Sequence, residues 1–173
     1  MKKYIVIGNP IEHSLSPLLH THWIEAKNLK ATYDKKKLEK DQLKEIISNI
    51  KNKNMSGANV TVPFKNEVIQ YLDKLSPEAD KTQSVNTIYL ENEDVIGANT
   101  DIRGFELAIN ETGYDVSQKS ALILGAGGVV PSIIVALKKM KASEIIVSNR
   151  TKANAENLRD LFKDLKIVEW GET

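Results

Sequence analysis

Short apolar runs alternate with amphipathic segments along the whole chain. Runs rich in β-branched and aliphatic residues, bounded by glycine, proline, asparagine or serine, are typical of strands. They cover residues 3–7, 31–35, 57–62, 86–90, 120–124, 144–148 and 166–169. Between them, apolar residues recur at helical spacing, as Leu38, Leu43, Ile46, Ile47 and Ile50 and again as Ile133, Ile134, Leu137 and Met140. This alternation predicts an α/β fold with a mainly parallel sheet.

Hydroxyl and proline residues mark where helices begin. Ser16-Pro17 and Ser76-Pro77 each place a hydroxyl that can cap a helix before a proline suited to the first helical turn. Thr151 is placed to cap a later helix.

A polar turn at residues 113–119 separates a helix predicted from Asp101 to Thr112 from the apolar strand that follows. The turn predicts two domains, residues 1–113 and residues 114–173. The second contains strand, helix, strand, helix and strand, which is the first half of a doubly wound, Rossmann-like dinucleotide-binding domain. Because the remaining half is absent from the 173 residues, we expect a chain truncated at its C-terminus.

Composition narrows the classes of function. The 24 basic and 23 acidic residues nearly cancel, so we expect no nucleic-acid or lipid partner. No apolar stretch reaches the roughly 20 residues needed to cross a bilayer. The absence of cysteine excludes disulfides and fits a cytoplasmic protein. The three histidines, which are His13, His20 and His22, lack metal-ligand spacing, so we expect no metal site.

A glycine-rich loop, Gly125-Ala126-Gly127-Gly128, follows the apolar strand at 120–124. Glycines at this point let the backbone approach a pyrophosphate, and the N–H groups that begin the next helix bind anions. Such turns also occur for packing alone, and Val130 replaces the third glycine of the usual fingerprint. Pro131 falls in the first turn of that helix, where proline is tolerated.

The end of the strand at 144–148 indicates which dinucleotide binds. An NAD site places a carboxylate near this point, whereas the 2′-phosphate of NADP requires a cation. Here Asn149, Arg150, Thr151 and Lys152 follow the strand, without a carboxylate. Arg150 can stack on adenine and pair with the 2′-phosphate, and Lys152 can add charge, so the pattern favours NADP. The alternative is a surface arginine before a capped helix.

Two further groups of residues are candidates for chemistry. Ser14 and Ser16 flank a predicted helix start, where they either cap it locally or bind an anion such as a carboxylate. Lys65 follows a strand and Asp101 opens a helix. If they meet, the carboxylate can orient the ammonium to donate a proton to a carbonyl oxygen as hydride arrives. Otherwise they form a structural ion pair or are two unrelated surface charges. If the pair does meet in a cleft, Thr61 and Asn86 would supply polar groups for substrate hydroxyls.

Taken together, the motifs resemble shikimate dehydrogenase. The resemblance runs through Gly8-Asn9-Pro10, His13-Ser14-Leu15-Ser16-Pro17, Asn59-Val60-Thr61-Val62-Pro63-Phe64-Lys65, Val85-Asn86-Thr87, Asn99-Thr100-Asp101, Gly125-Ala126-Gly127-Gly128 and Asn149-Arg150-Thr151. It implies reduction of 3-dehydroshikimate to shikimate with NADPH, on the pathway to chorismate and the aromatic amino acids, by a monomer or homodimer.

The resemblance also implies roles for residues. Lys65 and Asp101 become the catalytic pair, and Ser14 and Ser16 bind the substrate carboxylate. Thr61, Asn86 and Asp101 contact the substrate hydroxyls. The cofactor contacts are Gly125, Ala126, Gly127, Gly128, Val129, Asn149, Arg150, Thr151 and Lys152.

The chain departs from the family pattern at two positions. Val129 stands where the family often has a small residue, and Asn154 stands where a second basic residue is common. Two alternatives therefore stay open. One is a quinate or shikimate dehydrogenase that accepts NAD. The other, for these 173 residues alone, is a fragment that binds shikimate without catalysis.

Overall fold

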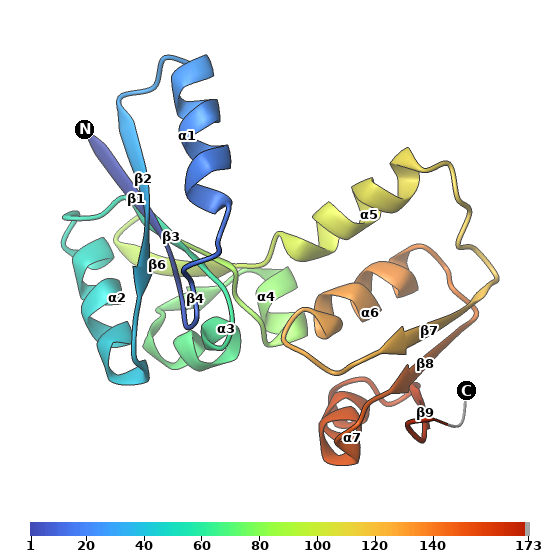
Figure 1. Cartoon of the computed structure of the whole chain (residues 1–173). Coiled ribbons are helices and arrows are strands. Elements are labelled where there is room, and N and C mark those ends of the chain that lie inside the picture. The colour runs from blue at the N-terminus through green and yellow to red at the C-terminus, as the bar shows by residue number, and fades with distance from the viewer. Residues whose placement is uncertain (172–173) are drawn as a thin grey trace. The chain divides into compact units, whose positions relative to one another are not determined.

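The computed structural model describes residues 1–171 and divides the chain into two compact units (Figure 1). The first spans Met1–Asn99 and the second begins at Thr100. Each unit has its own sheet and its own hydrophobic core. Within the described residues, no helix is long and apolar enough to cross a membrane.

A six-stranded sheet organises the first unit. Its strands are β1 (Lys2–Gly8), β2 (Ala31–Lys37), β3 (Gly57–Val60), β4 (Lys74–Leu75), β5 (Thr87–Glu91) and β6 (Asp94–Ala98), in the order β2-β1-β3-β5-β6-β4. β1 runs parallel to β2 and β3, and β4 runs parallel to β6. β5 is antiparallel to both of its neighbours. The predicted α/β class and the parallel pairing around β1 are confirmed, and the sheet as a whole is mixed.

A two-residue hairpin explains the antiparallel pairing of β5 with β6. Asn92 and Glu93 join β5 to β6 with φ values of 47° and 73°. Positive φ at both central residues is the geometry of a type I′ turn, which joins antiparallel strands. The sequence pattern does not predict β4 or β6, because β4 has only two residues and β6 is a short run interrupted by Gly97.

Helices cover both faces of this sheet. They are α1 (Ser16–Ala26), α2 (Leu43–Lys51), α3 (Phe64–Glu67) and α4 (Pro77–Thr82), with short 3₁₀ segments at Lys40–Gln42 and Val68–Tyr71. Alternate residues of β1 point to opposite faces. Ile5 and Ile7 pack in the cluster that contains the buried face of α2, while Tyr4 and Val6 pack with Ile24 of α1. Burial on both faces accounts for the continuous apolar run of β1.

The two predicted serine caps have different outcomes. Ser76 caps α4, since its Oγ accepts a hydrogen bond of 3.2 Å from the backbone N–H of Ala79. The prediction that Ser16 caps α1 is wrong, because Ser16 is itself the first helical residue and the N-cap is Leu15. Thr151 is the N-cap residue of α7 (Lys152–Leu161), but its side chain makes no capping hydrogen bond.

The second unit contains α5 (Asp101–Glu111), β7 (Ser120–Leu124), α6 (Val130–Lys139), β8 (Glu144–Ser148), α7 and β9 (Lys166–Val168). Its strands are parallel, in the order β7-β8-β9. The predicted half of a doubly wound dinucleotide fold is therefore confirmed. Pro131 lies in the first turn of α6, as predicted.

The compact units divide before α5, whereas the polar turn at residues 113–119 suggested a division after it. Ile102, Phe105 and Ile109 of α5 pack in the same cluster as Ile134 of α6. The apolar face of α5 therefore belongs to the second core. A polar turn marks where a helix ends, but side-chain packing decides which core that helix joins.

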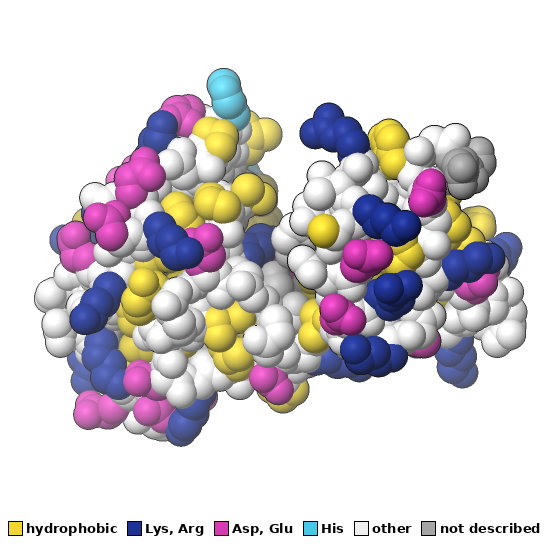
Figure 2. Space-filling model, turned by 90° about the horizontal axis from the view of Figure 1, so that it is seen from below, with side chains coloured by type: hydrophobic (Ala, Val, Ile, Leu, Met, Phe, Trp, Pro, Cys, Tyr) yellow, Lys and Arg dark blue, Asp and Glu magenta, His cyan; other side chains and the backbone are white. Residues whose placement is uncertain are grey.

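Charged side chains are mixed on the surface. On the face seen in Figure 2, Lys and Arg side chains are interspersed with Asp and Glu over both units. This pattern agrees with the nearly balanced composition of 24 basic and 23 acidic residues.

Two glycines provide opposite tests of the fold. A Cβ at Gly57 would lie 2.7 Å from the carbonyl oxygen of Ile88, so Gly57→Ala must push β3 and β5 apart. We expect this variant to lose about 1–3 kcal/mol of unfolding free energy. Gly104 lies exposed on α5 with nothing within 4 Å of an added Cβ, so Gly104→Ala should gain up to about 1 kcal/mol. Urea unfolding measures the free energy of both variants. A midpoint for Gly57→Ala equal to that of Gly104→Ala would contradict the expectation.

Candidate functional site

A cavity of about 260 Å³ opens in the first unit, where the carboxyl ends of β1 and β3 lie side by side. It is lined by Val6, Pro10, Ile11, His13, Ser14, Ser16 and Thr61. The carboxyl ends of adjacent parallel strands are a common place for ligands in α/β folds. Ser14, Ser16 and Thr61, which the sequence analysis selected from different segments, are thus brought to one cavity.

Close contact between two loops shapes this cavity. The loop after β3 bonds to β1 through the N–H of Thr61, which donates to Ile7 O at 2.9 Å. The N–H of Asn9 donates in return to Val62 O at 2.9 Å. A Cβ at Gly8 would lie 2.6 Å from the Thr61 methyl carbon and 3.0 Å from Val62 O. Only glycine fits at the end of β1 without moving Thr61.

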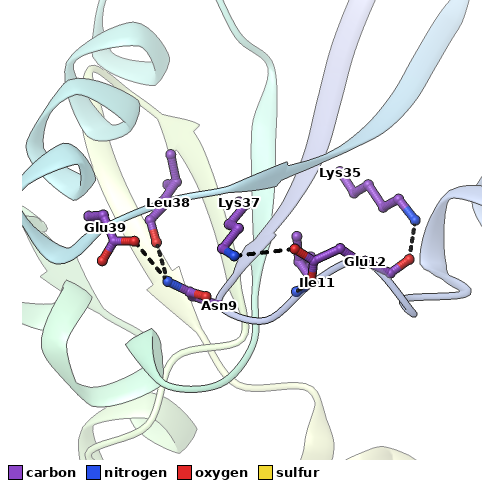
Figure 3. A network of polar contacts seen from close by, with 7 residues as sticks. All are labelled: Asn9, Ile11, Glu12, Lys35, Lys37, Leu38 and Glu39. Carbon is purple, nitrogen blue, oxygen red and sulfur yellow. Dashed lines mark hydrogen bonds and ion pairs between the residues drawn. The ribbon is translucent and has the colours of Figure 1, made fainter.

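A polar network anchors the loop that carries the two serines (Figure 3). Asn9 Nδ2 donates to Leu38 O at 3.2 Å and to Glu39 Oε1 at 3.1 Å, so the start of the loop is tied to the chain after β2. Further along, Glu12 Oε1 lies 3.3 Å from Lys37 Nζ. The Lys35 ammonium also donates to the backbone oxygen of Glu12.

Glu12 is held in its ionised form by these contacts. Backbone hydrogen bonds, first that of Glu12 itself and then that of Ile11, lower the pKa of its carboxyl, and Lys37 lowers it further. Within the loop, Ser14 Oγ accepts from the N–H of Ser16 at 3.3 Å. Ser14 thus makes a local contact with the backbone, while binding of an anion by the two serines stays a prediction. That bond uses Ser14 as an acceptor, so its O–H remains able to donate.

Lys65 and Asn86 lie on segments next to Thr61. Lys65 is a half-buried residue of α3, which directly follows the Thr61 loop. Its carbonyl oxygen accepts from the N–H of Val85 at 2.8 Å, which joins α3 to the segment that carries Asn86. The backbone oxygen of Asn86 accepts from Val60 at 2.9 Å, because antiparallel β5 starts beside the end of β3.

The Asn99-Thr100-Asp101 motif straddles the division between the two units. Asn99 is buried, and its Nδ2 donates to Ser84 O at 2.8 Å and to Thr82 Oγ1 at 3.2 Å. This side chain therefore holds the end of β6 to the chain after α4. Asp101 is half-buried and is the first residue of α5. Its pairing with Lys65 stays a prediction.

The glycine loop of the second unit has the geometry of an anion-binding turn. Gly125 has φ of +115°, a conformation that L side chains rarely adopt. An added Cβ at Gly127 or Gly128 would meet nothing within 4 Å, so the space over these residues is open. At the start of α6 the N–H of Val130 donates to Gly127 O at 2.9 Å and that of Ser132 donates to Val129 O at 3.0 Å. What suits this end to an anion is therefore the positive end of the helix dipole.

Asn149 supports the glycine loop from β8. Its Oδ1 accepts from the N–H of Ala126 at 3.1 Å, and its Nδ2 donates to Thr151 O at 2.7 Å. The Asn149 side chain thus positions both the loop and the start of α7. Direct contact of this amide with a cofactor, which the family resemblance implies, stays a prediction.

A cavity of about 470 Å³ lies between α7 and the end of β9. Its lining residues are Asn149, Arg150, Lys152, Ala155, Glu156, Arg159, Ile167, Val168, Glu169 and Trp170. Lys152 Nζ lies 3.3 Å from Glu169 Oε1, so part of its charge is already paired. Within residues 1–171, no ion pair involves Arg150 or Arg159.

Arg159 and Trp170 line this cavity although no sequence motif had marked them as candidates. Lys152, Ala155, Glu156 and Arg159 follow the i, i+3, i+4, i+7 spacing of one helix face. That spacing could have drawn attention to Arg159. No sequence signal points to Trp170, because its place depends on how the chain leaves β9.

Comparison with known proteins agrees with this geometry. The sequence-family model of the shikimate dehydrogenase substrate binding domain matches residues 6–88. The family model of shikimate / quinate 5-dehydrogenase matches residues 106–170. The NADP(+) shikimate dehydrogenase of Pelagibacter ubique is 51% identical over 172 residues. The chain belongs to the shikimate dehydrogenase family. It covers 65% of the Pelagibacter protein and 63% of a Caldicellulosiruptor saccharolyticus relative that is 37% identical.

Solved structures of shikimate dehydrogenases have the same fold. The Aquifex aeolicus enzyme matches with a TM-score of 0.90 at 38% identity, over 97% of this chain and 62% of that chain. The Thermus thermophilus enzyme in complex with NADP(H) and shikimate matches with a TM-score of 0.87 at 32% identity, over 97% of this chain and 63% of that chain.

The lowered pKa of Glu12 makes a pH-dependent prediction. The ionised carboxylate stabilises the fold above the ordinary carboxyl pKa, and this contribution is lost as the pH falls through the lowered pKa. We expect Glu12→Gln to melt below the parent protein near pH 7, with a gap that closes in acid. Thermal melts across this range measure the gap.

Glu93→Gln is the matched control. The Glu93 side chain is 85% exposed and lies 3.4 Å from Lys53, so its loss should change the melting temperature little. A gap for Glu12→Gln that stays constant from neutral to acidic pH would contradict the role of its carboxylate.

Proposed function

We propose that the product of the complete gene is an NADP-dependent shikimate dehydrogenase, which reduces 3-dehydroshikimate to shikimate in the pathway to chorismate. The observation that carries this proposal is the convergence of Ser14, Ser16 and Thr61 on one cavity of the first unit. The glycine loop and the cationic cavity of the second unit support a dinucleotide cofactor.

The first cavity suits a small hydroxylated acid. Ser14 and Ser16 supply hydroxyl donors for a carboxylate, and Thr61 adds a hydroxyl from the facing loop. Val6 and Ile11 supply apolar contact for the face of a carbon ring. Recognition by neutral donors needs no arginine, and none lines this cavity.

The second unit fits NADP. The open space over Gly127 and Gly128 would accommodate a pyrophosphate, and the positive end of the α6 dipole would favour its negative charge. Arg150 stands where β8 ends and makes no ion pair with residues 1–171, so it would pair with a 2′-phosphate, and Arg159 offers a second cation in the same cavity. Arg159 would thereby compensate for Asn154, at which the family often has a basic residue.

The chain's own residues would move the proton. Bound NADPH would supply the hydride. Lys65 would donate a proton to the carbonyl oxygen of 3-dehydroshikimate as negative charge develops there, and Asp101 would orient the Lys65 ammonium. Asn86 would hold a ring hydroxyl so that the carbonyl faces Lys65.

Replacement of Lys65 tests the catalytic role. In the complete protein, Lys65→Ala should lower kcat by roughly 10²–10⁴-fold with a smaller change in KM, because the proton donor acts mainly in the transition state. Lys53→Ala, which removes a lysine of the same unit with a side chain 69% exposed, should keep the parent rate. Initial rates with 3-dehydroshikimate and NADPH measure both, and near-normal turnover of Lys65→Ala would refute the assignment.

Replacement of Arg150 tests the choice of cofactor. The parent protein should use NADPH more efficiently than NADH, and Arg150→Ala should lower that ratio of kcat/KM by about 10- to 100-fold, since hydrogen bonds to charged groups contribute about 1.5–3 kcal/mol. Lys163→Ala, with a side chain 81% exposed and outside the cavity lining, should leave the ratio unchanged. Equal use of both cofactors by the parent protein would favour the alternative of an NAD-accepting quinate or shikimate dehydrogenase.

A further inference from the structure

A chain of hydrogen bonds leads from the interior of the first unit to the side chain of Asn86. Tyr33 of β2 donates its O–H to Asn59 Oδ1 at 2.6 Å. Asn59 Nδ2 donates to Thr87 Oγ1 at 3.2 Å, and Thr87 Oγ1 donates to Asn86 Oδ1 at 2.9 Å. Tyr33 lies on β2, Asn59 on β3 and Thr87 on β5, with β1 between β2 and β3 in the sheet.

One backbone contact fixes the direction of the two bonds that the Asn59 side chain makes to Tyr33 and Thr87. Asn59 also contacts the carbonyl oxygen of Asn86 at 3.1 Å, and a carbonyl can only accept. The group of Asn59 at that contact must therefore be its NH₂. Its Oδ1 then faces Tyr33, which must donate.

The same logic continues toward Asn86. Thr87 Oγ1 accepts from the NH₂ of Asn59, and in the structure its hydroxyl donates to Asn86 Oδ1. The oxygen of the Asn86 amide is the end that faces Thr87 in the structure. Its nitrogen, which carries two donors, is the end turned away from the chain of bonds.

Tyr33, at the far end of this chain of hydrogen bonds, is protected from water. Tyr33 is only 8% exposed, and the ring of His20 stacks on it with centroids 4.0 Å apart and an interplanar angle of 1°. Burial raises the pKa of Tyr33 to about 12, so its hydroxyl stays protonated and remains a donor over the working range of an enzyme.

We infer that Tyr33, Asn59 and Thr87 form a directional relay that positions the Asn86 amide as a hydrogen-bond donor toward a hydroxyl oxygen of the substrate. This inference rests on the proposed function, in which Asn86 holds a ring hydroxyl of shikimate. Tyr33, Asn59 and Thr87 are positioning residues here, because they act through Asn86. A ligand that presents only a hydrogen-bond donor to the NH₂ of Asn86 would bind poorly, because two donors would face each other.

Thr87→Val tests the relay, because valine keeps the shape of threonine and removes its hydroxyl. In the complete protein, calorimetric titration should show about 10- to 100-fold weaker binding of shikimate, as the Asn86 amide loses its orientation. Thr87→Ser, which restores the hydroxyl, should bind within about threefold of the parent. The Kd for NADP should stay unchanged in both variants.

A double-mutant cycle separates positioning from a general loss of structure. If Thr87 acts through Asn86, adding Thr87→Val to Asn86→Ala should weaken shikimate binding little further. Thr32→Val, at an exposed threonine of β2, is the matched control and should bind shikimate like the parent. Additive losses, or equal losses for Thr87→Val and Thr87→Ser, would overturn the relay.

Tyr33→Phe keeps the test decisive if Thr87→Val does not fold. Removing the first donor should weaken shikimate binding by about 2- to 10-fold and leave the Kd for NADP unchanged. Parent-like binding by Tyr33→Phe would overturn the relay. If the parent protein itself does not bind shikimate, the proposed function fails instead, so the two failures are distinguishable.

Discussion

The parallel pairing of β1 with β3 is the contact on which the first unit's site depends. It brings together the loops that follow the two strands, and the N–H of Asn9 then bonds to Val62 O while the N–H of Thr61 bonds to Ile7 O. Gly8 allows this approach because no side chain separates the loops. The cavity that joins Thr61 with Ser14 and Ser16 exists only where these loops meet.

Asparagine side chains fasten the functional loops to the sheets. The side-chain NH₂ groups of these residues donate to backbone oxygens of other segments. Asn9 donates to the chain after β2, Asn59 to the residue before β5, and Asn99 to the chain after α4. In the second unit, Asn149 bonds the glycine loop. An amide carries donors and an acceptor on a short side chain, so it can satisfy backbone groups of two segments at once. Several residues of the family motifs therefore hold loops in place.

The two units place their cations differently. In the first unit, Lys35 and Lys37 both contact Glu12 and so hold the loop that carries Ser14 and Ser16. Neither lysine lines the cavity, where Ser14, Ser16 and Thr61 offer neutral hydroxyls. In the second, Lys152 is paired with Glu169, while no ion pair within residues 1–171 involves Arg150 or Arg159. Neutral donors suit a small acid, and unpaired guanidinium groups suit a phosphate. This difference supports separate roles for the two units.

Local sequence was enough to predict β1, β7 and β8, the amphipathic helices α2 and α6, and the glycine loop, because each is determined by short-range periodicity and backbone freedom. It also grouped Ser14, Ser16 and Thr61 by family resemblance. Tertiary structure alone decided that β5 runs antiparallel, that α5 joins the second core, and that Arg159 shares a cavity with Arg150. These features depend on contacts between residues far apart in the chain, and a pattern read along one segment contains no information about the partner that the segment meets.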